Sequence, residues 1–462
     1  MISFHHLKHC NEMIDNLNLD WDLKKRFVVD TREYQNGDAF IAIPGQRVNP
    51  LNLIKDLLVK GCEYVFYQKS EENDSIIKNY QGEFPTAKFI AVKNSIAFIQ
   101  ELAHLHIKEW LKDKSHTLFA ISGSNGKTTH KEMLTHIMEA ILPGRVVSTQ
   151  KNNNNHLGVP LTLLNVSEET QFVVLELGSN HPGEIKFLCD IALPNAGITT
   201  NIGATHLEFF GTEREVFLEE GYLYYAVKEN TDGKGFFLIN QNDKFLKELA
   251  DTEGSKRFSS NDDGQVKMTF FPDGAKLGEV EVHNAYITGQ HNKSNLVTCA
   301  YIAVNFFPQF KEKIIQAAAT FRPTPNRSQW IKVEEAKVFL DAYNANPSSM
   351  KAALQGFKEQ LLQDGMSLDQ SCVVLGDMNE LGVSSAAYHQ EIGTFVKELG
   401  FNNIIFIGRF AQDYIKGAKA GHAYENAAQF KAEYQKSYLR ELSYHFIKGS
   451  RSLQLESLFD IT

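Results

Sequence analysis

The chain has 462 residues, a hydrophobic fraction of 43% and a formal net charge of −9. Its length predicts about three domains, and its acidic balance disfavours general binding to nucleic acids or anionic membranes. The sequence lacks a transmembrane-length apolar run and a signal-peptide pattern at its N-terminus. Its five scattered cysteines indicate a reducing compartment rather than a disulfide scaffold or a zinc site. We therefore expect a cytoplasmic protein without membrane insertion.

Residues 1–114 form the first predicted domain, a small α/β module that ends in the polar segment 112–115. Short apolar runs bounded by turn residues predict strands, and longer periodic stretches predict helices. The expected strands lie at 26–32, 39–43 and 64–67, and the expected helices at 51–60 and 96–111. By itself this module does not indicate a function.

The second predicted domain, residues 115–320, opens with the most informative stretch of the chain. An apolar strand at 117–121 runs into Gly-Ser-Asn-Gly-Lys-Thr-Thr at 123–129, and a helix follows. This order is typical of a P-loop, in which backbone N–H groups and a helix N-terminus surround phosphate oxygens. Lys127 adds a full charge and the Thr128 hydroxyl suits Mg²⁺. Because Ile121 stands where the strict pattern has glycine, an ordinary strand-to-helix turn is the alternative.

Strands and helices then alternate, which predicts a parallel sheet whose ligands bind at the carboxyl ends of the strands. Glu176 and His206 each follow such a strand, and the asparagine-rich loop 151–160 precedes an apolar run. A carboxylate and an imidazole suit Mg²⁺ or Mn²⁺ beside a nucleotide. Alternatively, Glu176 caps a helix, His206 is a surface histidine and the loop is merely solvated. At 289–295, where another helix begins, asparagine and serine side chains could cap that helix or contact a nucleotide.

The third predicted domain, residues 321–462, begins at a proline-containing linker. Its expected strands are 338–341, which ends in an acid, 372–378 and 403–408. This pattern again predicts a doubly wound α/β sheet. The predicted fold class is therefore α/β with three domains: a small N-terminal domain, a central P-loop-type domain with a parallel sheet, and a Rossmann-like C-terminal domain.

Several of these motifs together resemble the Mur ligases. They are the P-loop, the asparagine-rich loop, Glu-Leu-Gly at 176–178, Thr-Asn-Ile-Gly at 200–203 with His206, and Gly-Gln-His-Asn at 289–292. The segments 341–350, 375–382 and 448–451 resemble the member that adds D-alanyl-D-alanine to UDP-N-acetylmuramoyl-tripeptide. The resemblance covers nearly the whole chain and is strongest from residue 117 onwards.

The resemblance implies an ATP-dependent amide ligase of peptidoglycan precursor synthesis, and hence a role in cell-wall formation, cell shape and division. Its partners would be ATP, the UDP-muramoyl peptide and D-Ala-D-Ala, with Mg²⁺ as cofactor and no nucleic acid. The first domain would bind the UDP substrate, the second ATP, and the third the dipeptide while closing over the site. ATP would activate a carboxylate as an acyl phosphate, which the incoming amine attacks. We expect a monomer.

The resemblance also implies roles for individual residues. The implied catalytic residues are Lys127, Glu176 and His206. The implied ATP-binding residues are Gly123, Ser124, Asn125, Gly126, Lys127, Thr128, Thr129, Asn292, Asn295, Arg327 and Asp341. The implied substrate-binding residues are Asp30, Thr31, Arg32, Asn152, Asn154, Asn155, Tyr343, Asn344 and Asn346. Thr128, Glu176 and His206 would hold the metal, with Glu220 as a fourth ligand.

Glu220 stands where the family usually carries a lysine that is modified to a carbamate and helps to hold Mg²⁺. We expect its carboxylate to replace that anionic ligand, although it could instead be a solvated helix residue. A second departure lies at 46–51, where the family's usual Asp-Gly pattern is missing. Two alternatives therefore remain: a Mur-like ligase for another acid and amine, and a nucleotide-binding module with little catalytic activity.

Overall fold

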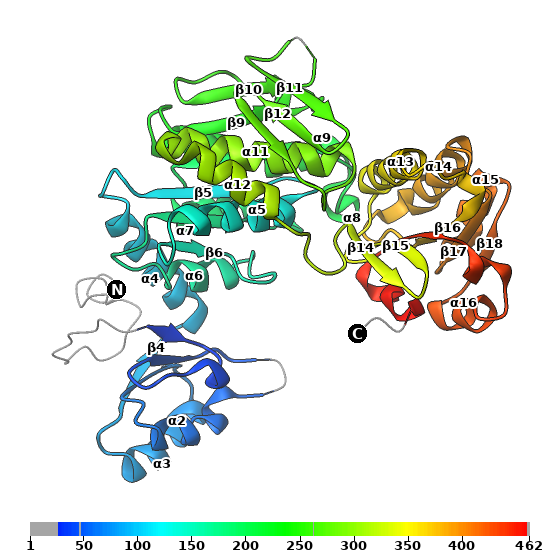
Figure 1. The fold of residues 1–462 in the computed structure, drawn as a ribbon. Coiled ribbons are helices and arrows are strands. Elements are labelled where there is room, and N and C mark those ends of the chain that lie inside the picture. The colour runs from blue at the N-terminus through cyan, green and yellow to red at the C-terminus, as the bar shows by residue number, and fades with distance from the viewer. Residues whose placement is uncertain (1–25, 46–47, 262, 460–462) are drawn as a thin grey trace.

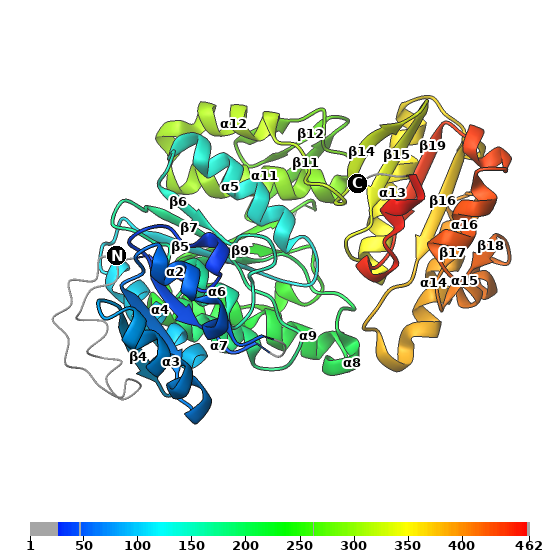
Figure 2. The same cartoon turned by 90° about the horizontal axis from the view of Figure 1, so that it is seen from below.

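The computed structural model of the protein describes residues 26–45, 48–261 and 263–459. Three β-sheets follow one another along the chain, each with its own helices (Figure 1). The bodies built on the first and third sheets lie apart from each other, and each adjoins the middle body (Figures 1 and 2). The predicted α/β class with a parallel-dominated central sheet is confirmed.

The first sheet is parallel and its four strands follow the chain order. Its elements are β1 (Phe27–Val28), β2 (Ala39–Ala42), β3 (Tyr64–Gln68), β4 (Lys88–Val92), α2 (Lys55–Val59), α3 (Glu71–Glu83) and α4 (Ser95–Trp110). The helix expected at 51–60 is divided into a 3-10 turn (Pro50–Leu53) and α2. Asn49 starts this turn by accepting the Leu51 N–H at 3.1 Å, and the ring of Pro50 suits the first helical position.

Helix α4 joins the first body to the second. Its buried Phe98, Leu102 and Ile107 belong to one continuous apolar core that includes Phe66 of β3 and Leu118 of the central sheet. Helices α2 and α3 cover the opposite face of the first sheet. The first body is thus attached to the central sheet through a shared core, since α4 buries apolar side chains against both.

The central sheet has nine strands in the order β13-β12-β11-β10-β9-β8-β5-β7-β6. Strands from β6 through β11 are parallel, and β12 and β13 extend the sheet in antiparallel fashion. Their bounds are β5 (Thr117–Ser122), β6 (Val146–Ser148), β7 (Phe172–Glu176), β8 (Ala196–Thr199), β9 (Phe236–Asn240), β10 (Ser255–Ser259), β11 (Val266–Phe271), β12 (Gly274–Leu277) and β13 (Val280–His283).

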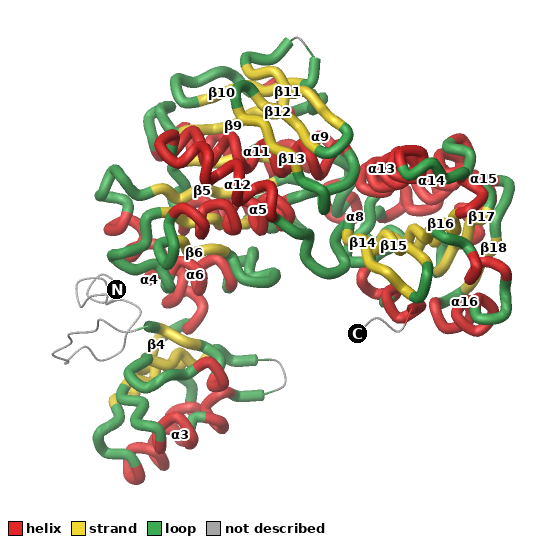
Figure 3. Tube along the Cα trace, viewed as in Figure 1, coloured by secondary structure: helices red, strands yellow, loops and turns green. Residues whose placement is uncertain are grey.

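Helices cover both faces of this sheet, as the alternation of its strand residues requires (Figure 3). In β5, Leu118 and Ala120 belong to the core shared with α4, whereas Phe119 and Ile121 belong to the core on the other face. The second core is covered by α5 (Lys127–Ile141), α11 (Gln290–Phe306) and α12 (Lys311–Thr320). The first is covered by α6 (Gly158–Leu163), α7 (Glu184–Ala192), α8 (Leu207–Phe210), α9 (Glu213–Glu220) and α10 (Tyr222–Asn230).

The third sheet has the order β14-β15-β19-β16-β17-β18, and only β14 runs antiparallel to its neighbour. Its strands are β14 (Gln329–Val333), β15 (Ala336–Asp341), β16 (Ser371–Gly376), β17 (Asn403–Ile407), β18 (His422–Tyr424) and β19 (Tyr444–Lys448). One face carries α13 (Pro347–Gln363), α14 (Ser385–Glu398) and α15 (Ala411–Ala418), and the other carries α16 (Ala427–Tyr434). Helices on both faces make this sheet doubly wound, as predicted.

Within the described ranges 26–45, 48–261 and 263–459, no helix combines the length and apolar character needed to cross a membrane. The feature that matters for function is the placement of strand ends. Residues that follow β5, β7 and β8 of the central sheet and β15, β16 and β19 of the third sheet line one shared cavity. Ligands of parallel sheets bind at such carboxyl ends.

Candidate active site

The loop between β5 and α5 has a backbone that only glycine suits at two positions. Gly123 has φ +120° and Gly126 has φ +80°, in the left-handed region. A Cβ atom on Gly123 would lie 2.3 Å from Thr200 Oγ1, so a side chain there would collide with the residue that follows β8. Asn201 holds the loop from the same side, because its carbonyl oxygen accepts the Ser124 N–H at 2.8 Å. The loop is therefore tied to the end of β8, and α5 begins directly after it.

A cavity of about 880 Å³ opens in front of this loop. Six of the seven predicted loop residues line it, from Ser124 through Thr129, whereas Gly123 does not. The cavity also takes in the predicted residues Asn152, Asn154, Asn155, Glu176, His206, Asn292, Asn295, Arg327, Asp341, Tyr343 and Asn344. The N-terminus of α5 thus presents its partial positive charge and the Lys127 side chain to a space large enough for a nucleotide.

Glu176 is the last residue of β7 and pairs with Ile121 of β5 in the parallel register. Its Oε1 atom accepts hydrogen bonds from Thr128 Oγ1 at 3.0 Å and from Asn154 Nδ2 at 2.9 Å. The second oxygen, Oε2, is buried and has no hydrogen-bond partner among the described residues. The alternative role as a helix cap is wrong, since Glu176 ends a strand and neither of its recorded partners is a helical N–H.

His206 lies just before α8 with φ +53°, in the left-handed region, which is strained for a residue other than glycine. Its Nδ1 atom lies 2.6 Å from Oε2 of Glu380, which comes from the third body. The imidazole holds the pKa of the Glu380 carboxyl below its usual range. Glu380 also has a positive φ, +64°, and its carbonyl oxygen accepts the Glu208 N–H at 3.2 Å. Two strained residues therefore meet where the bodies touch, and His206 is not simply a surface histidine.

The third body places a charged set on the opposite wall of the cavity. The buried Lys448 ammonium lies 2.5 Å from Oδ2 of Asp341, and these residues are paired neighbours at the ends of β19 and β15. The Arg327 guanidinium stacks 3.9 Å from the centre of the Tyr343 ring. The Tyr343 hydroxyl accepts a hydrogen bond from Asn152 of the central body. Tyr343 therefore contacts a predicted residue of the asparagine-rich loop, and Asp341 and Arg327 line the same cavity.

Asn346 is buried and does not line the cavity. Its side chain accepts the Ser349 N–H at 2.9 Å and so caps α13, and its amide nitrogen donates to Oδ1 of Asn125 in the P-loop. The Asn125 side-chain amide in turn donates a hydrogen bond to Ser348 Oγ at 2.8 Å. The neighbouring Asn344, which does line the cavity, accepts a hydrogen bond from Lys448 through its carbonyl oxygen at 2.9 Å. The start of α13 is thus in direct contact with the P-loop.

A second cavity of about 430 Å³ adjoins the first and shares Asn201, His291 and Asn295 with it. Desolvation by the surrounding protein lowers the pKa of His291 to about 4, so its imidazole is neutral at pH 7. Helix α11 begins after Gly289 without a side-chain cap, so the alternative in which Asn292 or Ser294 caps this helix is wrong. The buried Asn292 instead donates to the Thr288 carbonyl oxygen at 3.1 Å.

The predicted residues of the first body lie outside the main cavity. Asp30 caps the short turn Thr31–Glu33 and accepts the Arg32 N–H at 2.9 Å. Its hydrogen bonds with Arg32, together with a smaller effect of the Lys151 charge in the asparagine-rich loop, lower the pKa of the Asp30 carboxyl to about 2. The segment 46–51, which lacks the Asp-Gly pattern expected from the resemblance, lies partly outside the described residues, because Gln46 and Arg47 are not described. The first body therefore approaches the loop but not the P-loop itself.

Two family models match the chain: the Mur ligase middle domain at residues 121–303, and the Mur ligase, glutamate ligase domain at residues 326–450. Together they span about two thirds of the chain, on the two bodies whose strand ends form the cavity. The chain belongs to the Mur ligase family.

Individual relatives agree with this assignment to the Mur ligases. The UDP-N-acetylmuramoyl-tripeptide–D-alanyl-D-alanine ligases of Bacillus subtilis and Escherichia coli are each 27% identical, over 93% of this chain and 91% of their own length. A crystal structure of MurF from Acinetobacter baumannii has the same fold, with a TM-score of 0.81, 24% identity, and coverage of 99% of this chain and 98% of that one. MurF from Thermotoga maritima in complex with ADP matches with a TM-score of 0.74, 21% identity, and coverage of 94% and 96%.

Glu220, which the sequence predicts as a replacement for a carbamylated lysine, is only 1% exposed. The alternative that it is a solvated helix residue is therefore wrong. It does not line the cavity, because its carboxylate faces the inner side of the P-loop. Its Oε2 atom accepts the Gly123 N–H at 2.7 Å, and Oε1 lies 3.5 Å from Lys127 Nζ.

Three further residues of this Mur ligase were not predicted to belong to the site. They are Glu380, which meets His206, Lys448, which pairs with Asp341, and Ser348, which meets Asn125. Lys448 had a signal in the sequence, since it is a charged residue at the end of an apolar strand. Ser348 and Glu380 lie within the segments 341–350 and 375–382 that resemble the family, but the sequence does not show which residues of the central body they contact.

Proposed function

We propose that this Mur ligase joins D-alanyl-D-alanine to UDP-N-acetylmuramoyl-tripeptide in an ATP-dependent, ADP-forming reaction of peptidoglycan precursor synthesis. One observation carries the proposal: the P-loop, Glu176 and the charged set of the third sheet line a single cavity. The relatives with this printed activity match nearly the full length of the chain. None of the described features specifically favours the alternative of another acid and amine.

The three bodies would divide the work. We propose that residues 1–114 hold the UDP end of the acceptor through Asp30, Thr31 and Arg32. Residues 115–320 would hold ATP at the P-loop, with the second cavity beside Asn292 and Asn295 taking the nucleoside. Residues 321–462 would hold the dipeptide beside Tyr343 and Asn344. The asparagine-rich loop, with Asn152, Asn154 and Asn155, lies between these regions and would position the acceptor.

In the proposed reaction, a carboxylate oxygen of the tripeptide attacks the γ-phosphorus of ATP and ADP leaves. The amine of the dipeptide then attacks the acyl carbon of the resulting acyl phosphate, and the tetrahedral intermediate collapses to the amide as phosphate leaves. Lys127 and the α5 N-terminus would stabilise the negative charge on the transferring group. Arg327 would add a second positive charge from the third body.

The residues beside the P-loop fit a divalent cation. Thr128, Glu176 and His206 would hold Mg²⁺, and the buried Oε2 of Glu176, which has no polar partner among the described residues, would then gain one. When bound, Mg²⁺ neutralises charge on the phosphate oxygens. The sequence predicts Glu220 as a further ligand, but both recorded contacts of its carboxylate lie on the P-loop rather than in the cavity, so we do not place it among the residues that would hold Mg²⁺.

The test is an assay of phosphate release and product mass with ATP, Mg²⁺, the UDP-muramoyl tripeptide and D-Ala-D-Ala, omitting one component at a time. We expect amide formation only when all are present. Tripeptides with lysine or diaminopimelate in the third position would identify the diamino acid that this enzyme accepts. Turnover with a different acid, and none with the muramoyl tripeptide, would support the alternative ligase. Nucleotide binding without turnover of any acid would support the nucleotide-binding module.

A further inference from the structure

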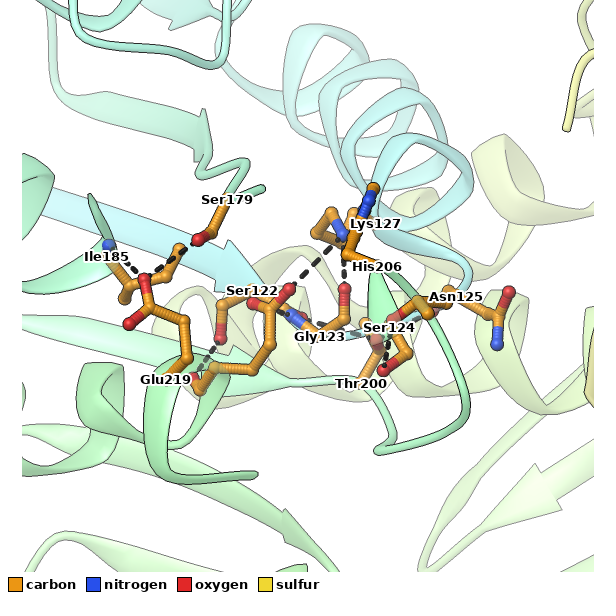
Figure 4. A network of polar contacts seen from close by, with 12 residues as sticks. Ser122, Gly123, Ser124, Asn125, Lys127, Ser179, Ile185, Thr200, His206 and Glu219 are labelled. Carbon is orange, nitrogen blue, oxygen red and sulfur yellow. Dashed lines mark hydrogen bonds and ion pairs between the residues drawn. The ribbon is translucent and has the colours of Figure 1, made fainter. Parts of the chain in front are cut away.

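Helix α9 ends in two adjacent buried glutamates whose carboxylates contact different loops. Figure 4 shows Glu219 pointing toward Ser179 and Ile185. Glu219 is 7% exposed and Glu220 is 1% exposed. Buried carboxylates are rare unless hydrogen bonds or opposite charges compensate for their loss of hydration. The partners of each glutamate therefore indicate what it does.

Glu219 anchors the segment that follows β7. Its carboxylate accepts hydrogen bonds from Ser179 Oγ at 2.8 Å, Gly183 N at 2.7 Å and Ile185 N at 2.7 Å. Because Gly183 provides no side-chain cap for α7, Glu219 supplies acceptors for the first N–H groups of that helix. All of its recorded partners are neutral, so the role of Glu219 is to fix the position of a chain segment.

Glu220 anchors the P-loop and also faces its lysine. The Gly123 N–H donates to Oε2 at 2.7 Å, while Oε1 lies 3.5 Å from Lys127 Nζ. The backbone carbonyl of Glu220 accepts a hydrogen bond from Ser122 Oγ at 2.8 Å, so main chain and side chain hold consecutive residues of the loop. Lys127 donates in turn to the Gly123 carbonyl oxygen. Glu220, Gly123 and Lys127 thus form a closed set of contacts on the inner side of the loop.

Lys127 nevertheless remains available to the cavity. Its side chain is 14% exposed and lines the cavity, whereas the Glu220 side chain is 2% exposed and does not. An ammonium group has three N–H donors, of which the loop carbonyl uses one. The negative charge of Glu220 attracts this ammonium group from the inner side of the P-loop. It therefore competes with any phosphate that binds Lys127 from the cavity.

We propose that Glu220 is a positioning residue that acts through Lys127. Its carboxylate holds the ammonium in the pose needed for phosphoryl transfer, and it simultaneously weakens the attraction of Lys127 for bound nucleotide. The inference rests on the proposed function, because it assigns Glu220 a part in the same ATP site. It differs from a metal-ligand role, which would have the carboxylate reach into the cavity.

Glu220→Gln separates these roles, because glutamine can still accept the Gly123 N–H but carries no charge. We expect an unchanged Tm, a kcat lower by about tenfold because Lys127 is less well placed, and an ATP KM that is unchanged or lower. Titration with ADP alone should show equal or several-fold tighter binding, since the competing negative charge is gone. The Mg²⁺ concentration needed for half-maximal rate should not change.

Glu219→Gln is the matched control, because it removes the same charge from the same end of α9. Its partners are the segment after β7, so we expect a lower Tm and an unchanged affinity for ADP. If Glu220→Gln does not fold, Glu220→Asp provides the test. It keeps the charge on a shorter side chain, so kcat should fall without tighter ADP binding.

Three results would overturn the proposal. Loss of ADP affinity together with a lower Tm in Glu220→Gln would make Glu220 a scaffold residue. A raised Mg²⁺ requirement with full kcat at saturating Mg²⁺ would make it a metal ligand. Unchanged kinetics and ADP binding would leave it with neither role. ADP titration requires no acceptor substrate, so a wrong substrate assignment would leave the binding comparison intact and appear only as absent turnover in the wild type.

Discussion

The two sheets that meet at the cavity contribute to it in different ways. At the edge of the central sheet, the P-loop is held from within its own body by Thr200, Asn201 and Glu220. At the edge of the third sheet, Asp341 and Lys448 hold each other, whereas Asn346, Ser348 and Glu380 contact the central body across the boundary. The wall formed by the central body is therefore held by contacts within that body. The wall formed by the third body also depends on how the third body packs against the central one.

The docking contacts fall on residues with chemical roles in the proposal. Asn125 of the P-loop meets Asn346 and Ser348, and His206 meets Glu380. Because of this difference, we expect substitutions on the two walls to reduce activity in different ways. Changes on the central wall should abolish chemistry in a folded protein, whereas changes on the third-body wall should weaken the assembly of the site.

The largest effect is expected from Lys127→Ala on the central wall. Loss of the ammonium removes the only lysine charge contributed by the P-loop, so amide formation should fall by about 10³-fold or more. Initial rates at saturating substrates measure it. Lys112→Ala, which removes an exposed charge paired with Glu109, is the control and should have full activity. Substantial activity in Lys127→Ala would contradict a prebuilt central wall.

Glu176→Gln should have the next largest effect. It keeps an oxygen for Thr128 but removes the carboxylate charge that Mg²⁺ would meet, so the rate should fall about 10²-fold and the Mg²⁺ requirement should rise. A titration of rate against Mg²⁺ concentration checks both quantities. Glu169→Gln, an exposed change just before β7, should alter neither. An unchanged Mg²⁺ requirement would remove Glu176 from the metal site.

Asn346 tests the docked wall. Asn346→Ala removes both the α13 cap and the contact with Asn125, and should cost about 1 kcal/mol of stability and several-fold in kcat/KM. Asn346→Ser keeps a capping side chain but cannot reach Asn125 in the same way, so stability should recover while kcat/KM stays low.

The control for this prediction is Asn426→Ala, because Asn426 caps α16 in the same body, away from the cavity. Urea unfolding should show a similar loss of stability, with kcat/KM unchanged. Equal losses of kcat/KM in both variants would mean that α13 stability, rather than contact with the P-loop, governs the docked wall.

The smallest expected effect is on pH dependence, and it should not distinguish the walls. Burial lowers the pKa of His130 and His291 in the central body, and of His445 in the third, to about 4. The folded state therefore favours neutral imidazoles, and their stabilisation is complete above the unfolded pKa of about 6.5. It is lost as the pH falls from there towards 4, by about 1.4 kcal/mol per pH unit for each histidine.

The free energy of unfolding should therefore fall less steeply between pH 7 and pH 5 in His445→Gln than in the wild type. The difference should equal the contribution of one buried histidine. Urea unfolding at several pH values measures this slope. His422→Gln, at an exposed position of the same body, should leave it unchanged. A slope that is identical in both variants and the wild type would contradict the burial argument for His445.

Local patterns in the sequence predicted the elements that form the central wall. The apolar run of β5, the glycines before Lys127 and the acid at the end of β7 each appear within a few residues. Their chemistry follows from backbone geometry, since only glycine suits φ +120° at Gly123 and strand ends of a parallel sheet share one edge. The prediction of a single helix at 51–60 failed in detail, because Pro50 and Asn49 impose a separate turn.

Longer-range relations were harder to predict. Asn292 looked like a helix cap because the sequence does not show where α11 starts, and the helix begins earlier, after Gly289. Glu220 could be read as solvated because the sequence does not show which face of α9 turns inward. The domain boundaries and the site roles remain predictions that the proposed experiments address.

By itself, the sequence determined the three-domain α/β class, the phosphate-binding loop and the polar strand ends, because these depend on residue periodicity and on local backbone constraints. Only the tertiary structure decided which side chains from distant parts of the chain contact the loop and the strand ends. The Lys448–Asp341 pair joins residues 107 positions apart, and the Asn125–Asn346 contact joins residues 221 positions apart. The physical reason is that such contacts depend on how whole sheets and helices pack against one another, and no short stretch of sequence encodes that packing.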